Sequence, residues 1–221
     1  MSIEGKILIQ CDFDGTVTEE DVSFALLDTH AKGDWRWLVD DYRHGKISLG
    51  TFNSTAFSMV KDSKKTLLKT ASLRAKARAG FTEFVGYCRA RGFRFVIVSN
   101  GLDFYIHDIL SKMGLGDVEI FASETRFGSD GIKVKYVGPD GAPLDDGFKE
   151  AYVRSFLKDG YHVIYIGDGF SDIPAAKRCH HIFATRELAT RCREMNLDCT
   201  PFVDFHEVRR GLEALSGIKA Q

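Results

Sequence analysis

The chain has 221 residues, 44% of them hydrophobic, which is enough to build one large domain or a core with a smaller attached domain. Thirty basic side chains balance thirty-one acidic ones, so the formal net charge is −1 and no overall attraction to nucleic acid or to an anionic membrane is expected. No stretch is apolar over the length that a transmembrane helix needs. These properties predict a soluble globular protein that meets any charged ligand locally.

Cysteine usage points to a reducing compartment. The five cysteines are odd in number and form no CxxC pair, which favours free thiols. The first six residues, Met-Ser-Ile-Glu-Gly-Lys, lead into a strand-like segment that is too short for a signal peptide. We therefore expect a cytoplasmic protein, present as a monomer or a homodimer.

The first element in chain order is an apolar run at residues 6–11, which predicts a buried strand. The following stretch, from about residue 21 to residue 78, contains no convincing strand. It carries helix-like segments around residues 24–27, 35–42 and 52–60. We therefore predict a small helical cap, residues 17–75, inserted directly after the first strand.

The rest of the chain alternates helices and strands. Apolar residues at helical spacing predict helices that include Phe81, Ile106 and Val153. Turn signals on both sides of residues 132–137 predict a hairpin and a flexible loop. The further expected strands are residues 93–99, 118–123, 162–166 and 181–184. This alternation is typical of a parallel sheet covered on both faces, so we predict an α/β fold with a three-layer, Rossmann-like core formed by residues 1–16 and 76–221.

Acidic and polar residues gather where the expected strands end. The first strand runs into Asp12 and Asp14, which share a face of an extended chain because they are two residues apart. The second ends in Ser99-Asn100-Gly101, and the fourth ends in a glycine-rich acidic loop that contains Asp168 and Asp172. Ligands of open parallel sheets bind beyond the carboxyl ends of the strands, so we expect these segments to form one site.

The charges suit phosphoryl transfer. Attack of a carboxylate on a phosphate dianion is opposed by roughly 4 kcal/mol per pair of unit charges at 4 Å and an effective dielectric near 20, so cations must be present. A Mg²⁺ ion held by Asp12 and Asp168 would supply one, because Mg²⁺ prefers sparse carboxylate sites. Lys149 would supply the second. Two other lysines, Lys133 and Lys135, are rivals for that position.

Four motifs in this order resemble those of the haloacid dehalogenase superfamily. Asp12-Phe13-Asp14-Gly15-Thr16 is similar to its first motif, Ser99 to its second and Lys149 to its third. Gly167-Asp168-Gly169-Phe170-Ser171-Asp172 is similar to its fourth. A lone DxD or GDG would be weak evidence, but here all four motifs occur in order at the ends of expected strands.

The resemblance implies a role for each residue. Asp12 would be the nucleophile that forms an aspartyl phosphate, and Asp14 the general acid and base that also binds metal through its backbone carbonyl. Asp168 would be a metal ligand, and Asp172 would orient Lys149 or a metal-bound water. Phosphate or substrate would be contacted by Thr16, Ser99, Asn100, Gly101 and Asp21.

A cap between the first and second motifs resembles the branch that contains phosphoserine phosphatase. That family places a Glu soon after the first motif and an Arg in the cap, whereas this chain has Asp21 and the Arg-free stretch 53–57. The whole chain is more similar to the 2-hydroxy-3-keto-5-methylthiopentenyl-1-phosphate phosphatases of methionine salvage. Residues 192–197 and 204–209 share that similarity, although the loop 124–147 lacks the cysteines of that family.

The sequence thus predicts a Mg²⁺-dependent phosphatase for a small phosphorylated metabolite, with three alternatives open. Its substrate could be the methylthio sugar phosphate or another small phosphomonoester, and the same intermediate could serve a phosphotransferase. A binding module without catalysis is the third. Aromatic residues of the cap, among them Phe52 and Phe57, could line an apolar pocket or simply pack the cap. The basic run from Lys61 to Arg78 could steer anions or form a solvated helix face.

Overall fold

The structure is a computed structural model that describes residues 5–216. One eight-stranded sheet has the order β5-β4-β3-β2-β1-β6-β7-β8. Its strands are β1 (Lys6–Cys11), β2 (Arg94–Leu102), β3 (Glu119–Gly128), β4 (Gly131–Val137), β5 (Pro143–Leu144), β6 (Tyr161–Gly167), β7 (His181–Ala184) and β8 (Thr200–Pro201). The strand β4 pairs antiparallel with both β3 and β5, and all other neighbouring strands are parallel. The predicted α/β fold with a mostly parallel sheet is confirmed, and so are its five expected strands.

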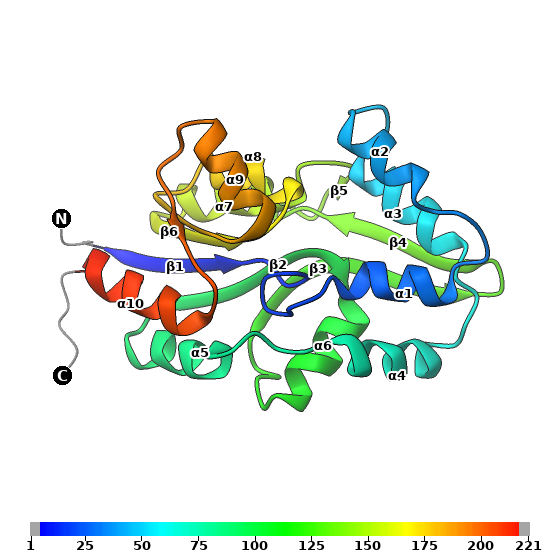
Figure 1. The fold of residues 1–221 in the computed structure, drawn as a ribbon, viewed down its shortest axis with the longest axis horizontal. Coiled ribbons are helices and arrows are strands. Elements are labelled where there is room, and N and C mark those ends of the chain that lie inside the picture. Colours follow the sequence, from blue (N-terminus) through cyan, green and yellow to red (C-terminus); the bar gives the residue numbers. More distant parts are fainter. Residues whose placement is uncertain (1–4, 217–221) are drawn as a thin grey trace.

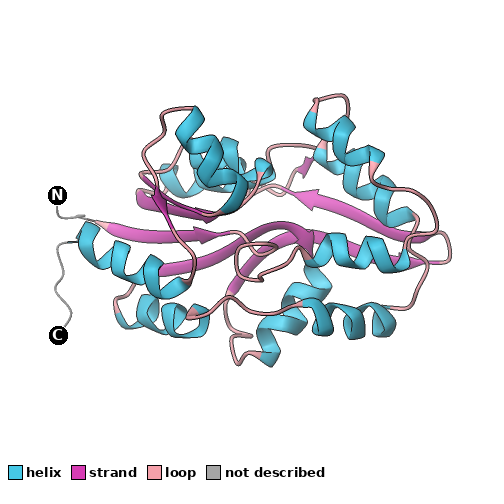
Figure 2. Ribbon diagram, viewed as in Figure 1, coloured by secondary structure: helices cyan, strands magenta, loops and turns pink. Residues whose placement is uncertain are grey.

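Helices cover both faces of the sheet (Figure 1). On one face lie α5 (Phe81–Ala90), α6 (Asp103–Lys112) and α10 (Phe205–Ser216). The opposite face carries α7 (Phe148–Lys158), α8 (Ile173–Ala176) and α9 (Arg186–Glu194), together with a short 3₁₀ turn at Phe170–Asp172. The colouring by secondary structure in Figure 2 shows the three layers, with strands between helices.

The helical insert after β1 is also confirmed. Its helices are α1 (Val22–His30), α2 (Trp37–Arg43), α3 (Leu49–Ser58) and α4 (Lys64–Arg74). They lie beyond the end of β1, where the longer hairpin of β3 and β4 continues, with α3 against β4 (Figure 1). Asp21, Ser48 and Ser63 begin α1, α3 and α4, because each accepts a hydrogen bond from a backbone N–H that has no partner within the first turn.

The chain enters and leaves the insert side by side. Thr18 forms an antiparallel bridge with Ala77, and the N–H of Glu19 donates to the carbonyl of Lys76 at 2.8 Å. These paired connections agree with a division near residues 17 and 75, although the division into two domains stays a prediction.

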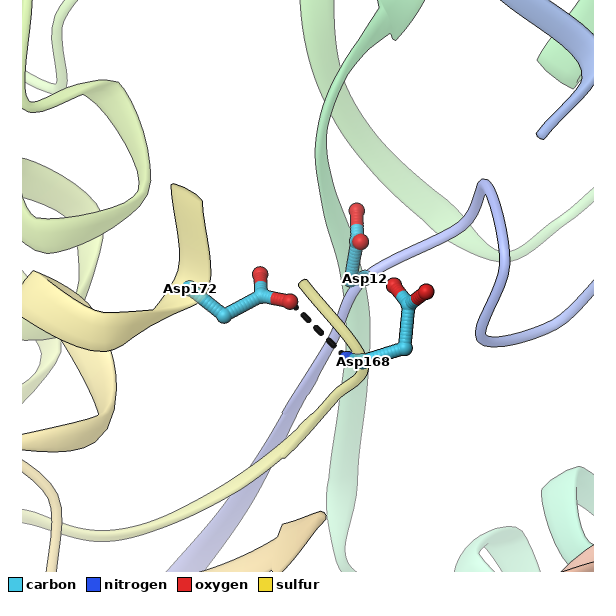
Figure 3. A group of neighbouring side chains, drawn as sticks. All are labelled: Asp12, Asp168 and Asp172. Atoms are coloured by element: carbon cyan, nitrogen blue, oxygen red, sulfur yellow. Dashed lines mark hydrogen bonds between the residues drawn. The ribbon is translucent and has the colours of Figure 1, made fainter. Parts of the chain in front are cut away.

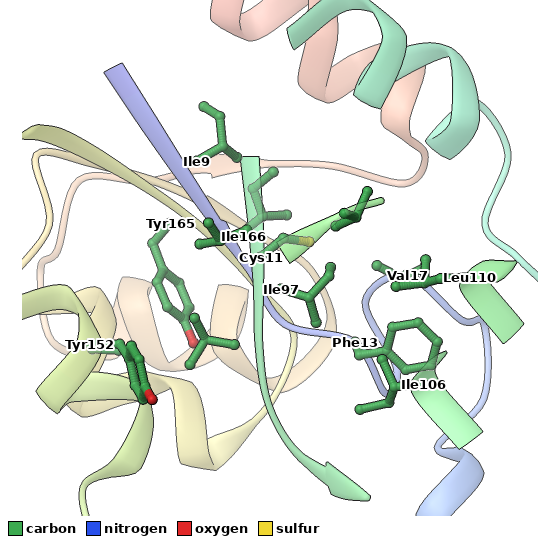
Figure 4. Close-up of a cluster of buried hydrophobic side chains, with 14 of the residues drawn as sticks. Ile9, Cys11, Phe13, Val17, Ile97, Ile106, Leu110, Tyr152, Tyr165 and Ile166 are labelled. Atoms are coloured by element: carbon green, nitrogen blue, oxygen red, sulfur yellow. The ribbon is translucent and has the colours of Figure 1, made fainter. Parts of the chain in front are cut away.

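The strand β1 lies at the centre of the core. Its side chains pack into helices on both faces, which is why the strand reads as an apolar run without alternation. Figure 4 shows Ile9, Cys11 and Phe13 among side chains of β2, β6 and α6. Each such side chain contributes about 1.5–3 kcal/mol on burial. Cys11 faces this core, and burial raises the pKa of its thiol well above the ordinary value, so it remains protonated.

Two features depart from a simple repeat of parallel strands and helices: the antiparallel strand β4 and a buried polar residue in β1. The strand β3 continues to Gly128 and pairs with β4, so the predicted hairpin at residues 132–137 is confirmed. The buried Gln10 interrupts the apolar run of β1, and its amide donates to the backbone carbonyl of Lys149 at 3.0 Å. Among residues 5–216, no helix is both long enough and apolar enough to cross a membrane.

Candidate active site

Three carboxylates meet where β1 and β6 end. Asp12 follows β1, Asp168 follows the neighbouring β6, and Asp172 lies in the short 3₁₀ turn after it. Each offers an oxygen, and these oxygens all lie within 4.8 Å of one another. Figure 3 shows the three side chains converging from these two chain segments. This is the proximity that parallel neighbouring strands predict for residues at their carboxyl ends.

Lys149 joins two of the carboxylates. Its ammonium lies 2.9 Å from Asp12 Oδ1 and 2.6 Å from Asp172 Oδ1, and it is only 3% exposed. The rival lysines, Lys133 and Lys135, are exposed on β4. Burial lowers the pKa of Lys149, but the charges of the two aspartates outweigh this and raise it above the ordinary value. Lys149 is therefore a fixed cation.

Asp172 holds the loop that carries Asp168. Its Oδ2 accepts hydrogen bonds from the backbone N–H of Asp168 at 2.9 Å and of Gly169 at 2.8 Å. Its Oδ1 accepts from the hydroxyl of Tyr165 at 2.6 Å in addition to Lys149. These four hydrogen bonds fix the position of the Asp172 carboxylate, so Asp172 orients both Lys149 and the loop that carries Asp168.

The carboxylates outnumber the buried cations. Burial raises the pKa of Asp12 to about 7 against the opposing charge of Lys149, and burial together with Asp12 raises that of Asp168 to about 8. Holding the two ionised carboxylates of Asp12 and Asp168 this close together is therefore electrostatically unfavourable. A divalent cation would remove this repulsion, and hard oxygen donors are what such cations prefer. The residues present therefore fit a metal ion.

The side chain of Asp14 points to different partners. Its Oδ1 accepts from the backbone N–H of Val22 at 3.0 Å, and its Oδ2 accepts from the hydroxyl of Tyr105. It is not one of the three clustered carboxylates. Burial, reinforced by the charge of Asp21, raises the pKa of Asp14 well above its ordinary value. Two carboxyls two residues apart thus have different surroundings, which suits different roles.

The turn after β1 lies very close to the carboxylate of Asp168. Gly15 has a φ of 77°, and a Cβ on this residue would overlap the carboxylate of Asp168. The hydroxyl of Thr16 donates to Asp168 Oδ1 at 3.2 Å, so it supports that carboxylate directly. From the far side Arg78 donates to the carbonyl of Gly15 at 2.6 Å and to that of Thr16 at 2.8 Å.

The end of β2 lines the other side of the site. The hydroxyl of Ser99 accepts from the backbone N–H of Gly101 at 3.0 Å, and the carbonyl of Asn100 accepts from the hydroxyl of Tyr136 at 2.6 Å. The structure therefore brings Ser99, Asn100 and Gly101 to the same cavity as Asp12 and Lys149.

This cavity has a volume of about 370 Å³ and lies between the sheet and the insert. Asp21 lines it but also caps α1, and burial raises the pKa of Asp21 to about 6. Phe52 lines the cavity as well, whereas Phe57 is buried in the packing of the insert, so the cap aromatics divide between the two expected uses. The wall contributed by the insert consists of Asp21, Ser23, Phe24, Val39, Tyr42, Arg43, Leu49, Phe52 and Asn53.

Three residues of the site are not apparent from the sequence. Tyr105 contacts Asp14, and Arg78, which the sequence places in a basic run, supports the first motif instead. Arg186 lines the cavity with a φ of 48°, donates to the carbonyl of Glu19, and has its guanidinium 3.9 Å from Asp168. The residues in contact are far apart in the chain and share no motif, so no local signal could have revealed them.

A family model decides what kind of protein carries this site. The model of the haloacid dehalogenase-like hydrolases matches residues 9–177, which include all four motifs. The chain belongs to the haloacid dehalogenase-like hydrolases. The family that the motifs predict is therefore confirmed.

Relatives of this hydrolase are phosphatases. The 2-hydroxy-3-keto-5-methylthiopentenyl-1-phosphate phosphatase of Bacillus velezensis is 34% identical over 218 residues, which cover 96% of this chain and 92% of the relative. The protein of the same name from Geobacillus kaustophilus is 32% identical and covers 96% of this chain and 98% of its own. The chain is thus a phosphatase of the haloacid dehalogenase type, as the motifs predict.

Solved phosphoserine phosphatases share the fold of this hydrolase. A structure with an analogue of the phospho-aspartyl intermediate superposes with a TM-score of 0.68 at 21% identity, covering 94% of this chain and 99% of the other. A substrate-bound complex reaches 0.69 at 19% identity with the same coverage. At these identities the likeness shows the fold alone.

Proposed function

We propose that this phosphatase hydrolyses a small phosphomonoester with Mg²⁺ and an aspartyl-phosphate intermediate on Asp12. The observation that carries the proposal is the meeting of Asp12, Asp168 and Lys149 at the ends of β1 and β6. Asp12 and Asp168 would hold the ion, with the backbone carbonyl of Asp14 as a further ligand. When bound, Mg²⁺ supplies positive charge that lets a carboxylate approach a phosphate dianion.

The residues of this chain divide the work. Asp12 attacks phosphorus, and Lys149 neutralises charge on the phosphoryl group from a position where Asp172 holds it. Asp14, whose pKa is raised above its ordinary value by burial and by the charge of Asp21, would donate a proton to the leaving oxygen. It then takes a proton from the water that hydrolyses the aspartyl phosphate. Ser99 and nearby backbone amides, with Thr16, Asn100 and Gly101, would hold the phosphoryl oxygens.

The cavity supports the methylthio substrate of the methionine-salvage relatives. Its insert wall presents Phe24, Val39 and Phe52, which suit an apolar group at the end of the substrate opposite the phosphate. Both arginines that line it are engaged, Arg43 with Glu187 at 2.6 Å and Arg186 with the carbonyl of Glu19. They are poorly placed to clamp the carboxylate of phosphoserine. We therefore propose 2-hydroxy-3-keto-5-methylthiopentenyl-1-phosphate as the substrate.

A panel of phosphorylated metabolites tests the substrate. Release of phosphate is measured from the methylthio enol phosphate, from amino-acid phosphates and from sugar phosphates. We expect the highest kcat/KM for the methylthio compound. A preference for phosphoserine would contradict the proposal, and transfer of phosphate to an added alcohol in place of water would make the protein a phosphotransferase.

The chemistry is tested on the same protein. Asp12→Asn should lower kcat by about 10³-fold or more while the variant stays folded, because the amide cannot form the intermediate. EDTA should silence the wild type and Mg²⁺ should restore it. Full activity in EDTA would contradict the metal, and an active Asp12→Asn variant would contradict the nucleophile.

A further inference from the structure

The hydroxyl of Tyr105 links the insert to Asp14. Tyr105 comes from α6 and is fully buried. Its hydroxyl donates to Asp14 Oδ2 and lies 2.7 Å from the hydroxyl of Ser23 on α1. A tyrosine hydroxyl has one proton, so while Tyr105 donates it to the ionised carboxylate of Asp14, the oxygen of Tyr105 is left to accept a hydrogen bond from Ser23. The chain of hydrogen bonds runs from Ser23 through Tyr105 to Asp14.

The ring of Tyr105 is fixed by its surroundings. Phe104 packs edge-on against it with ring centroids 5.5 Å apart, and Phe13 lies at 6.3 Å. The absence of a side chain on Gly101 leaves room for the hydroxyl of Tyr105 to reach Asp14, because a Cβ on Gly101 would overlap both that hydroxyl and the carboxylate of Asp14. A residue held in this way restricts the position of the carboxyl that it contacts.

The two oxygens of Asp14 are held from different directions. The N–H of Val22 at the start of α1 holds Oδ1, while Tyr105 on the core helix α6 holds Oδ2. Both Val22 and Ser23 belong to the first helix of the insert. The orientation of Asp14 therefore depends on the seating of α1 against the core.

We propose that Tyr105 is a positioning residue for Asp14, which it holds in the rotamer that reaches the leaving oxygen, with Ser23 as its own hydrogen-bond donor. This inference rests on the proposed function, since it assumes that Asp14 is the general acid and base. Tyr105 itself exchanges no proton with the substrate. Its effect is confined to steps in which Asp14 must meet a departing oxygen or an entering water.

Leaving groups of different basicity isolate this effect. An alkyl phosphate needs a proton on its departing oxygen, whereas p-nitrophenolate departs without one. The probes are the alkyl phosphate that the wild type turns over fastest and p-nitrophenyl phosphate. For Tyr105→Phe we expect the single-turnover rate with the alkyl phosphate to fall about 10-fold to 10²-fold. The pre-steady-state burst of p-nitrophenolate should change less than about threefold.

One further variant is a control for the loss of a tyrosine hydroxyl, and a second tests the hydrogen bond between Ser23 and Tyr105. Tyr152→Phe removes the hydroxyl of another buried tyrosine, which donates to the carbonyl of Val137 at 3.1 Å outside the site, and should leave both rates unchanged. Ser23→Ala should reproduce the Tyr105→Phe pattern at a smaller size. Equal losses with both probes, or no loss with either, would overturn the positioning role of Tyr105.

Asp14→Asn separates the inference from the function on which it rests. If Asp14→Asn lowers the rate with the alkyl phosphate selectively and Tyr105→Phe does not, only the proposed role of Tyr105 is wrong. If Asp14→Asn shows no dependence on the leaving group, the role of Asp14 in the proposed function fails with it.

Discussion

Lys149 is the buried cation that forms ion pairs with two carboxylates of the site. It contacts Asp12 and Asp172 and leaves Asp168 without a buried cation at hydrogen-bonding distance among the residues that the structure describes. A buried charge whose partner is missing costs about 3–5 kcal/mol. The ionised carboxylate of Asp168 therefore destabilises the metal-free protein, and a bound cation would relieve that destabilisation.

Asp168→Asn should reveal this destabilisation. The amide keeps the shape and still accepts from Thr16, but it removes a negative charge beside Asp12 and Asp172. In EDTA, at a pH above the raised Asp168 pKa of about 8, we expect the variant to melt at a higher temperature than the wild type. Mg²⁺ at 100 times its Kd should raise the wild-type Tm by roughly 5–10 °C and leave that of the variant unchanged. An equal response of both proteins to Mg²⁺ would contradict the assignment of Asp168 as a ligand.

At the scale of elements, the order of the strands assembles the site. The strands β1 and β6 are neighbours and parallel, so Asp12 and Asp168 meet although 156 positions along the chain separate them. The last helix, α10, contributes to this arrangement from outside the site. It packs against α5, which in turn supports β2. The helix α10 is thus part of the core that holds the catalytic strands.

Phe205, the first residue of α10, tests this contribution. It is fully buried, with its ring 5.0 Å from that of Phe81 and 5.5 Å from that of Phe84. Phe205→Ala should lower the free energy of unfolding by about 3–5 kcal/mol in urea denaturation, because it leaves a cavity. Leu73→Ala, at a side chain 78% exposed on α4, should cost less than about 0.5 kcal/mol. Similar losses for both would mean that α10 does not belong to the cooperative core.

The whole molecule has a different chemistry at each end of its sheet. The aspartates gather at the carboxyl ends of the strands, while His162, His180 and His181 lie at the amino ends of β6 and β7. The rings of His162 and His180 stack with centroids 3.9 Å apart. Burial lowers the pKa of His162 and of His181, and for His162 the neighbouring imidazoles lower it further.

His162 and His181 are expected to make the stability of the fold depend on pH at a place far from the active site. A lowered pKa in the folded state means that the unfolded chain binds protons first, so their contribution to stability is complete above the unfolded pKa of 6.5. It is lost as the pH falls below that value. We expect His162→Asn to lose less stability than the wild type between pH 7.5 and pH 5.5 in urea denaturation, to an extent set by the pKa shift. Because the buried aspartates are common to both proteins, identical pH dependence would show that His162 has no part in it.

Local patterns in the sequence were enough to predict the main elements and motifs. The apolar run of residues 6–11 indicates a central strand, and acidic or glycine-rich turns after two such runs indicate where a ligand would bind. In a parallel sheet the carboxyl ends of strands share an edge, so Asp12, Asp168 and Ser99 could be placed together from chain position alone. Lys149 had two rivals, and only its burial beside Asp12 distinguished it.

Only the tertiary structure decided which side chains surround these motifs. Tyr105 lies 91 positions from Asp14, and Arg78 lies 63 positions from Gly15, yet each donates a hydrogen bond there. The division of the cap aromatics between pocket and packing depends in the same way on how α1, α2 and α3 sit over the sheet. Periodicity reports which face of an element is buried, but the partner on that face is chosen by the packing of the whole chain.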